Sequence, residues 1–169
     1  MSEPAEPQAP AVRSATLKTG VARITIHGVP NEPGVAARIF GEIGGRQINV
    51  DDIIHSTSDS GRNVIVSFTV DGRQADAARA AAEGIATAFG PATTVEMARD
   101  LARLRVVGMG MRAQSGVAAR IFQALAAEGI NIENISTSEI AISLLVALRD
   151  GERALQAVQR AFGLEQEQE

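Results

Sequence analysis

The 169-residue chain contains no cysteine, no tryptophan and no tyrosine. Without cysteine it can form no disulfide, no thiolate metal site and no thiol nucleophile. Aromatic residues make up only 3% of the chain, whereas hydrophobic residues make up 45%. We therefore expect a packed core built from Val, Ile, Leu and Ala side chains.

The chain also lacks an excess of positive charge and a long apolar run. Its formal net charge is −4, which provides no long-range attraction to nucleic acid or to an anionic membrane. No stretch approaches the roughly 18 consecutive apolar residues of a membrane-spanning helix. Residues 1–10 have neither the basic start nor the apolar centre of a secretory signal. We predict a soluble cytoplasmic protein that binds neither nucleic acid nor membrane.

Two copies of one sequence unit make up most of the chain. Residues 34–40, Gly-Val-Ala-Ala-Arg-Ile-Phe, recur letter for letter as residues 116–122. Phe89-Gly90 returns as Phe162-Gly163, so the second copy is shorter between these two matches. An identity of this length inside a wider match indicates an internal duplication, and each copy should fold as one unit.

The first copy has the pattern of a complete βαββαβ unit. Ala22, Ile24 and Ile26 alternate with polar residues, as in a half-buried strand. A turn at residues 30–34 precedes an apolar stripe at helical spacing, and Asn31 or Glu32 can cap that helix. The expected elements are strands at residues 22–26, 48–54, 64–70 and 93–98 and helices at residues 35–43 and 73–88, with Gly44-Gly45 ending the first helix.

The second copy lacks a fourth strand of its own. We expect strands at residues 104–107, 131–137 and 140–148 and helices at residues 117–127 and 152–162. An incomplete antiparallel sheet would expose backbone donors and acceptors, so residues 11–17 are predicted to cross over and complete it. The alternative is a disordered leader over residues 1–19.

These patterns predict an α+β fold of two ferredoxin-like domains, each an antiparallel sheet with helices on one face. The first domain is expected at residues 21–101, and the second at residues 11–19 plus 102–164. A disordered leader at residues 1–10 and a tail at residues 165–169 would remain.

The turn before each first helix resembles that of the ACT domain, in residues 28–40 of the first copy. The resemblance is more specific in the second copy, because residues 106–112, 116–119 and 131–140 resemble the tandem ACT region of aspartate kinase. Ile135-Ser136-Thr137-Ser138-Glu139-Ile140 is the specific part of this match. The resemblance extends from about Val12 to Leu164.

The resemblance implies a regulatory region without catalytic residues, metal or cofactor. It would bind threonine, lysine or both for feedback control of aspartate-family amino-acid biosynthesis. Its partners would be a second copy of itself and a catalytic kinase subunit or domain. Unpaired N–H groups at a helix start suit a carboxylate, and Gly34 lets the main chain approach closely. A carboxylate such as that of Asp51 suits an α-ammonium.

The resemblance also implies the residues that contact the effector. The first domain would contribute Asn31, Pro33, Gly34, Val35, Ala36, Asn49, Val50, Asp51 and His55. The second domain of a partner chain would contribute Asn131, Ile132 and Ser138. The sequence departs from the family at Asn31, where Asp is frequent, at His55, where Gln is frequent, and at Ala141, where a basic residue is usual.

Homodimerisation is also expected on physical grounds. Side-by-side sheets protect edge strands that would otherwise remain unpaired. The strand at residues 140–148 is apolar on both faces, with Leu144 and Leu145 adjacent, so its outer side should be covered.

Other interpretations of the same residues remain open. The chain could be the ACT subunit of another biosynthetic enzyme, such as acetolactate synthase, or a free-standing ACT sensor. A small nucleotide-binding enzyme could use Gly108-Met109-Gly110-Met111, which matches a loose dinucleotide fingerprint. Pro33-Gly34 could simply start a helix, Asp51 and Glu133 could be solvated strand-end carboxylates, and His27 is expected at the surface.

Overall fold

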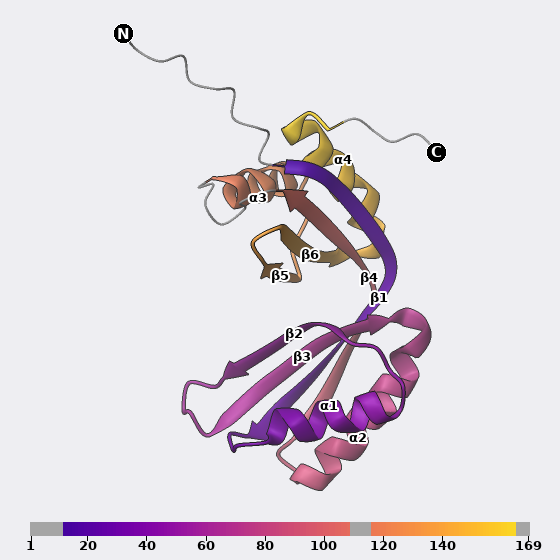
Figure 1. The fold of residues 1–169 in the computed structure, drawn as a ribbon, viewed down its shortest axis with the longest axis vertical. Coiled ribbons are helices and arrows are strands. Elements are labelled where there is room, and N and C mark those ends of the chain that lie inside the picture. The colour runs from indigo at the N-terminus through magenta and orange to yellow at the C-terminus, as the bar shows by residue number, and fades with distance from the viewer. Residues whose placement is uncertain (1–11, 109–115, 165–169) are drawn as a thin grey trace. The chain divides into compact units, whose positions relative to one another are not determined.

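The computed structural model describes residues 12–108 and 116–164 (Figure 1). The chain divides into two compact units, Gly20–Leu101 and a unit formed by the chain up to Thr19 together with the chain from Ala102 onward. The expectations for the leader, the tail and the loop after Gly108 lie outside the described residues. No helix in the described ranges is long and apolar enough to cross a membrane.

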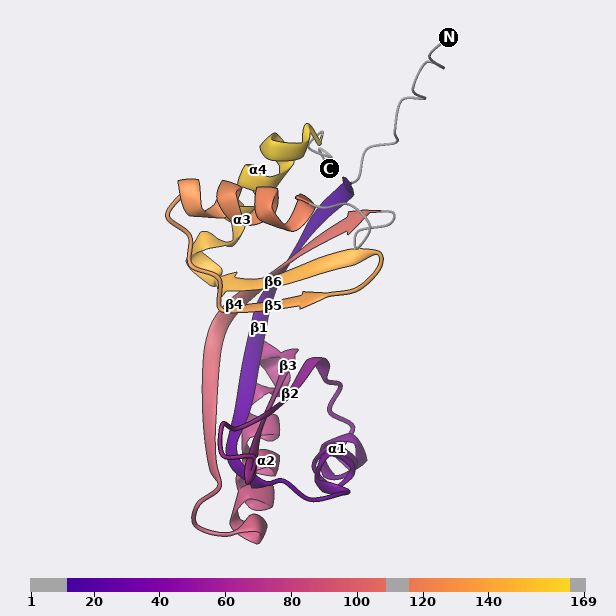
Figure 2. The ribbon, with the colours of Figure 1, turned by 90° about the vertical axis from the view of Figure 1, so that its left-hand side faces the viewer.

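The Gly20–Leu101 unit is a four-stranded sheet with two helices. Its strands lie in the order β2-β3-β1-β4, and β3 is antiparallel to both β1 and β2. Both helices cover the same face of the sheet (Figure 2). The elements are β1 (Val12–Pro30, from Gly20), α1 (Val35–Gly45), β2 (Asp51–Thr57), β3 (Asn63–Asp71), α2 (Ala75–Phe89) and β4 (Thr94–Gly108, up to Leu101).

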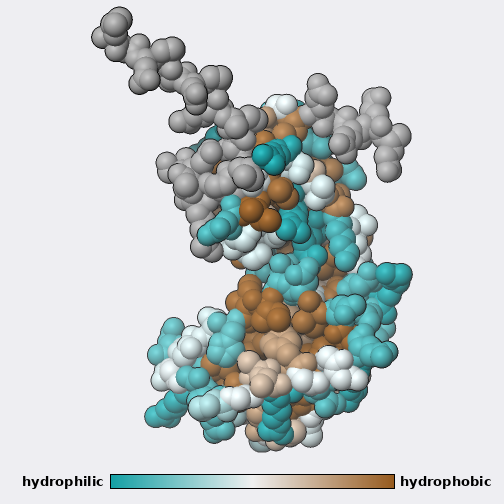
Figure 3. Space-filling model, in the orientation of Figure 1, coloured by the Kyte–Doolittle hydropathy of each residue, from teal (hydrophilic) through white to brown (hydrophobic). Residues whose placement is uncertain are grey.

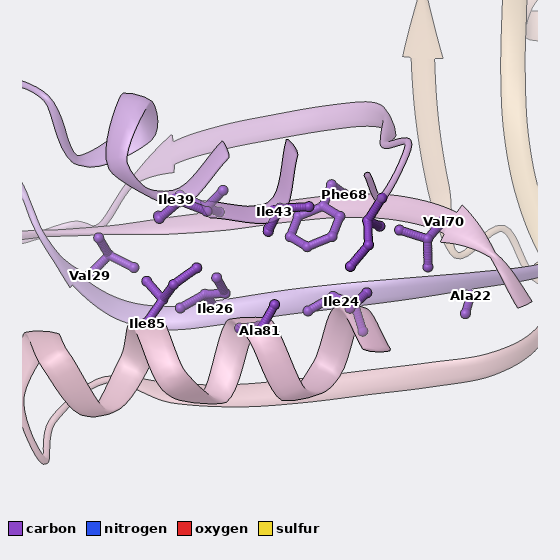
Figure 4. Close-up of a cluster of buried hydrophobic side chains, with 14 of the residues drawn as sticks. Ala22, Ile24, Ile26, Val29, Ile39, Ile43, Phe68, Val70, Ala81 and Ile85 are labelled. Atoms are coloured by element: carbon purple, nitrogen blue, oxygen red, sulfur yellow. The ribbon is translucent and has the colours of Figure 1, made fainter. Parts of the chain in front are cut away.

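The core of this unit lies between the sheet and the helices (Figure 4). Successive side chains of β1 and β3 point to opposite faces of the sheet. Those of Ile24, Ile26 and Phe68 point toward the helices, and all three are fully buried. The apolar side chains of α1 pack against them. The rings of Phe40 and Phe68 pack edge to face, with their centres 5.6 Å apart. Full burial of each such aliphatic side chain contributes about 1.5–3 kcal/mol.

The second unit has the same architecture. Its strands lie in the order β1-β4-β6-β5, and β5 is antiparallel to β6. Val12 is buried in its core, with Ala15 and Leu17 packed against that core. The elements are β1 up to Thr19, β4 from Ala102, α3 (Val117–Ala127), β5 (Asn134–Thr137), β6 (Ala141–Ala147) and α4 (Gly151–Phe162). The predicted α+β fold of two ferredoxin-like domains is confirmed.

Strands predicted as separate elements are continuous. Residues 11–17 and 22–26 were expected as two strands, but β1 runs unbroken from Val12 to Pro30. The expected strands at residues 93–98 and 104–107 are likewise one strand, β4. Near the boundary between the two units each strand contains a residue with a left-handed backbone, Gly20 with φ 68° and Asp100 with φ 54°. Each long strand is thus the first strand of one unit and the fourth of the other.

The start of β2 needs correction. Helix α1 ends at Gly45, as expected, and the chain reverses at Gln47, with φ 60°. Ile48 then donates its N–H to the carbonyl of Ile43 and is buried, so β2 begins three residues later than expected, at Asp51. The outer side of β6 was expected to be covered, and Leu145 is only 1% exposed already in the single chain.

Candidate functional site

The turn between β1 and α1 leaves the helix start without a side-chain cap. Gly34 is the N-cap residue, with φ 91° and ψ −4°, and in the described chain no side chain accepts a hydrogen bond from the first turn. The expectation that Asn31 or Glu32 caps this helix was therefore wrong. A side chain at residue 34 would strain this left-handed backbone, which glycine adopts readily. The backbone N–H of Val35 donates to the carbonyl of Glu32 at 3.4 Å, and the N–H groups that follow it in the first turn are in place for an external anion.

Asn31 instead ties the turn to the β2–β3 hairpin. Its Nδ2 donates to the carbonyl of Gly61 at 2.8 Å, and its backbone N–H donates to the carbonyl of Arg62 at 3.0 Å. An aspartate, the frequent family residue, could not donate the first of these bonds. Asn31 therefore has a structural role in shaping the turn.

The second copy repeats the backbone geometry of this turn. Gly116 is the N-cap residue of α3, with φ 92° and ψ −12°, and again no described side chain caps the helix. Arg38 donates its backbone N–H to the carbonyl of Gly34 at 3.0 Å, and Arg120 to that of Gly116 at 2.9 Å. Both copies thus present the same uncapped helix start.

The register places the predicted residues of the first domain at two ends of its sheet. Asp51 lies opposite Thr69, which lies opposite Arg23, whereas Pro30 lies opposite Asn63. Along the strand direction, Asp51 therefore lies at the level of the residue seven positions before the end of β1. The distance from this level to the end of β1 is roughly 20 Å at about 3.3 Å per residue. One end holds Asn31, Pro33, Gly34, Val35 and Ala36, the other holds Asn49, Val50 and Asp51, and His55 is exposed between them on the edge strand β2.

A bulge shapes the start of β2. The register shifts between Asp51 and Ile54, and Asp52 has a positive φ of 46°. Asp51 accepts the N–H of Asp52 at 2.9 Å, and Thr69 Oγ1 donates to Asp52 Oδ2 at 3.5 Å. Two carboxylates therefore stand together at this strand start, and Asp51 is exposed.

The predicted residues of the second domain are also divided between two ends of a strand. Asn131 and Ile132 precede β5, whereas Ser138 follows it. Ser138 Oγ accepts the N–H of Ile140 at 3.4 Å and that of Ala141 at 3.2 Å, which holds the β5–β6 turn. The hydroxyl of Ser138 thus has a structural role.

Two surface cavities of the first unit lie away from these residues. A cavity of about 680 Å³ lies between the end of α2 and the start of β4, and one of about 300 Å³ lies between α1 and α2. None of the predicted site residues lines either cavity. Figure 3 shows apolar residues gathered on the face of this unit that carries α1. Val35 is buried in the core and Val50 packs against it. The other predicted residues of the first domain lie at its surface, and a site there would need a second surface to close it.

One polar pair on the open face of the sheet could not be predicted. His27 was expected at the surface, and its side chain is 40% exposed, with Nε2 at 3.0 Å from Glu96 Oε2. The two residues are 69 positions apart, and only the pairing of β1 with β4 brings them together. An exposed pair of this kind contributes about 1 kcal/mol or less.

Comparison with known proteins identifies the family. ACT-domain models match residues 22–86 and 104–162. An aspartate kinase of Pseudomonas fluorescens is 38% identical over 156 residues, which cover 92% of this chain and 37% of that protein. The regulatory subunit of aspartate kinase from Thermus thermophilus, in its ligand-free form, is 36% identical with a TM-score of 0.82, and the match covers 90% of this chain and 99% of that one. The chain belongs to the ACT-domain regulatory regions of aspartate kinases.

The aspartate kinase resemblance carried by residues 106–140 is therefore confirmed, in preference to the acetolactate synthase alternative. The chain spans only 37% of the Pseudomonas fluorescens relative, but nearly all of a separately existing regulatory subunit. A more distant structure, aspartokinase III of E. coli in complex with lysine and aspartate, is 25% identical with a TM-score of 0.69. That match covers 90% of this chain and 33% of the E. coli chain.

Proposed function

We propose that this aspartate kinase regulatory region binds an end-product amino acid, threonine, lysine or both, and transmits the binding to a catalytic kinase subunit or domain. The observation that carries the proposal is the uncapped helix start that both copies share, with Gly34 and Gly116 in the same left-handed conformation. Backbone N–H groups at such a start bind a carboxylate, which every free amino acid carries. The lysine complex of the E. coli relative supports an amino-acid effector.

A homodimer would bring the two ends of the sheets together. β2 and β5 are the outermost strands of their units. If β2 of one chain pairs antiparallel with β5 of its partner, the helix-start end of one domain meets the strand-start end of the other. The α1 turn would then face the partner's Asn131 and Ile132. Asn49, Val50 and Asp51 would face the partner's Ser138 and the partner's α3 start.

In such a dimer the residues expected to line one pocket would be divided between two sites of the same kind. At each site a helix start would bind the carboxylate of the effector, and oxygen atoms at the facing strand start would bind its ammonium group. Asp51 and Asp52 both bring a carboxylate to the strand start of the first domain, and Asp51 is the exposed one of the two. This arrangement accounts for predicted residues that a single domain holds about 20 Å apart.

Ile53→Lys is expected to shift the protein toward monomer by tenfold or more. Ile53 lies on the edge strand β2 and is 52% exposed, and a charged residue on an edge strand opposes pairing. Ile65→Lys is the matched control, because Ile65 is 37% exposed but lies on the internal strand β3. Sedimentation velocity measures both. A monomeric wild type at high concentration, with and without threonine or lysine, would contradict the dimer.

Asp51→Ala is expected to weaken effector binding about tenfold or more. A hydrogen bond to a charged group contributes about 1.5–3 kcal/mol, and each 1.4 kcal/mol is a factor of ten. Asp59→Ala is the control, because Asp59 is also an exposed carboxylate but lies in the β2–β3 turn. Calorimetric titration checks the prediction. If both variants bind like the wild type, the placement of the ammonium group at Asp51 is wrong.

A thermal-shift screen with all amino acids and with nucleotides tests the function itself. A ligand at about 100 times its dissociation constant stabilises the native state by about 2.7 kcal/mol. We expect stabilisation by threonine, lysine or both. Stabilisation by nucleotides alone would overturn the proposal in favour of a nucleotide binder.

A further inference from the structure

Arg38 stacks on the aromatic ring that ends the second helix. Its guanidinium carbon lies 4.7 Å from the centre of the Phe89 ring. In the second copy Arg120 lies 4.4 Å from the centre of the Phe162 ring and also donates to the carbonyl of Ala161. Each stack joins the first helix of a unit to the C-terminal end of its second helix.

The two copies keep this contact although the chain between its partners differs in length. The arginines belong to the identical seven-residue segment, and the phenylalanines to the repeated Phe-Gly pair. The second copy is shorter between these matches, yet the stack has the same geometry. The contact therefore does not depend on one particular loop length.

The segment after Phe89 is also hydrogen-bonded to β1, the strand that leads into the turn before α1. Thr93 is 8% exposed, and its Oγ1 donates to the carbonyl of Gly28 at 3.0 Å. Phe89 contacts Arg38 on the other side of the turn. The end of α2 and the connection that follows it thus contact β1 near its end, at Gly28, and α1 at Arg38.

The charge of Arg38 also favours an anion at the helix start. The first turn of α1 contains no acidic residue. The positive charge is carried by the fourth residue of the helix, one turn from its start, and Arg38 also lines the cavity between α1 and α2. Glu42, one turn further along, is paired with Arg46 at 2.9 Å rather than with Arg38.

We propose that Arg38 is a positioning residue for the effector. By stacking on Phe89 it fixes the first turn of α1 in the geometry that receives the effector's carboxylate, and Arg120 on Phe162 has the same role in the second domain. The inference rests on the proposed function, since it assigns the support of that same site.

Arg38→Lys and Phe89→Leu test the proposal in the full chain. Lysine keeps the charge without the planar stacking group, and leucine keeps the apolar volume without the ring. The control is Arg79→Lys on α2, where Arg79 pairs with Glu83 at 2.9 Å. We measure threonine and lysine affinity by calorimetry, and without ligand we measure the amide exchange of residue 38, whose backbone N–H closes the first turn on the carbonyl of Gly34 at 3.0 Å. Both test variants should bind about three- to fivefold more weakly and exchange faster at residue 38.

Positioning also requires that the two substitutions act through one contact. The double variant should therefore bind no more weakly than the weaker single variant. Wild-type affinity in both single variants, or an equal loss in Arg79→Lys, would overturn the role of Arg38. If the wild type itself binds no amino acid, the proposed function fails. In that case unchanged exchange at residue 38 would overturn the stacking role as well, and faster exchange would support it.

Discussion

Gly28→Ala is expected to destabilise the Gly20–Leu101 unit by about 2–5 kcal/mol. A Cβ at residue 28 would lie 2.3 Å from the carbonyl oxygen of Ala92, and the backbone there has φ +69°. The left-handed conformation costs a non-glycine residue about 1–2 kcal/mol, and the overlap with backbone adds about 1–3 kcal/mol. Because Gly28 lies in the strand that leads into the turn before α1, the proposed effector site predicts that this substitution also weakens effector binding.

Gly61→Ala separates backbone strain from steric overlap. Gly61 has φ +70°, but a Cβ there would meet no atom within 4 Å. Only the cost of about 1–2 kcal/mol for the left-handed backbone is expected. Urea unfolding of the two variants measures the difference. Equal destabilisation by both would show that Ala92 is not held against Gly28.

Removal of residues 1–19 is expected to destabilise the second unit by several kcal/mol. The deletion takes away the part of β1 that lies beside β4 in this unit, together with the buried Val12 and the packed Ala15 and Leu17. Burial of such side chains contributes about 0.8 kcal/mol per CH₂ group, and the loss also leaves backbone groups of β4 unpaired. The Gly20–Leu101 unit keeps its own core.

Amide exchange locates the effect of this deletion. Slow exchange in β6 should be lost, whereas slow exchange in β3 should remain. Thr16→Ala, at an exposed position of the same strand, should leave both unchanged. Retained protection in β6 with faster exchange in β3 would contradict the assignment of residues 12–19 to the second unit.

Local structure followed closely from the sequence because its causes are local. The apolar spacing predicted helix α3 with its observed bounds, Val117–Ala127. The repeated heptapeptide predicted two equivalent turns, and Gly34 and Gly116 have φ values of 91° and 92°. The alternation on β1 likewise predicted that Ile24 and Ile26 would be buried.

Features that depend on sheet order could not be predicted. The two ends of the candidate site are separated by the register of β1, β2 and β3, which the residue pattern of each strand does not contain. The contacts of Asn31 with Gly61 and of Arg38 with Phe89 join residues far apart in sequence. The continuity of β1 and β4 was missed because exposed residues, among them Thr19 and Asp100, interrupt the apolar alternation without ending the strands.

Titration of the isotope-labelled chain with threonine, and separately with lysine, followed by amide NMR, tests the central claim most directly. The proposal predicts saturable shifts at the start of α1, residues 34–37, and at Asp51, caused by at least one of the two amino acids. Absence of shifts with both amino acids, or shifts confined to other parts of the chain, would contradict it.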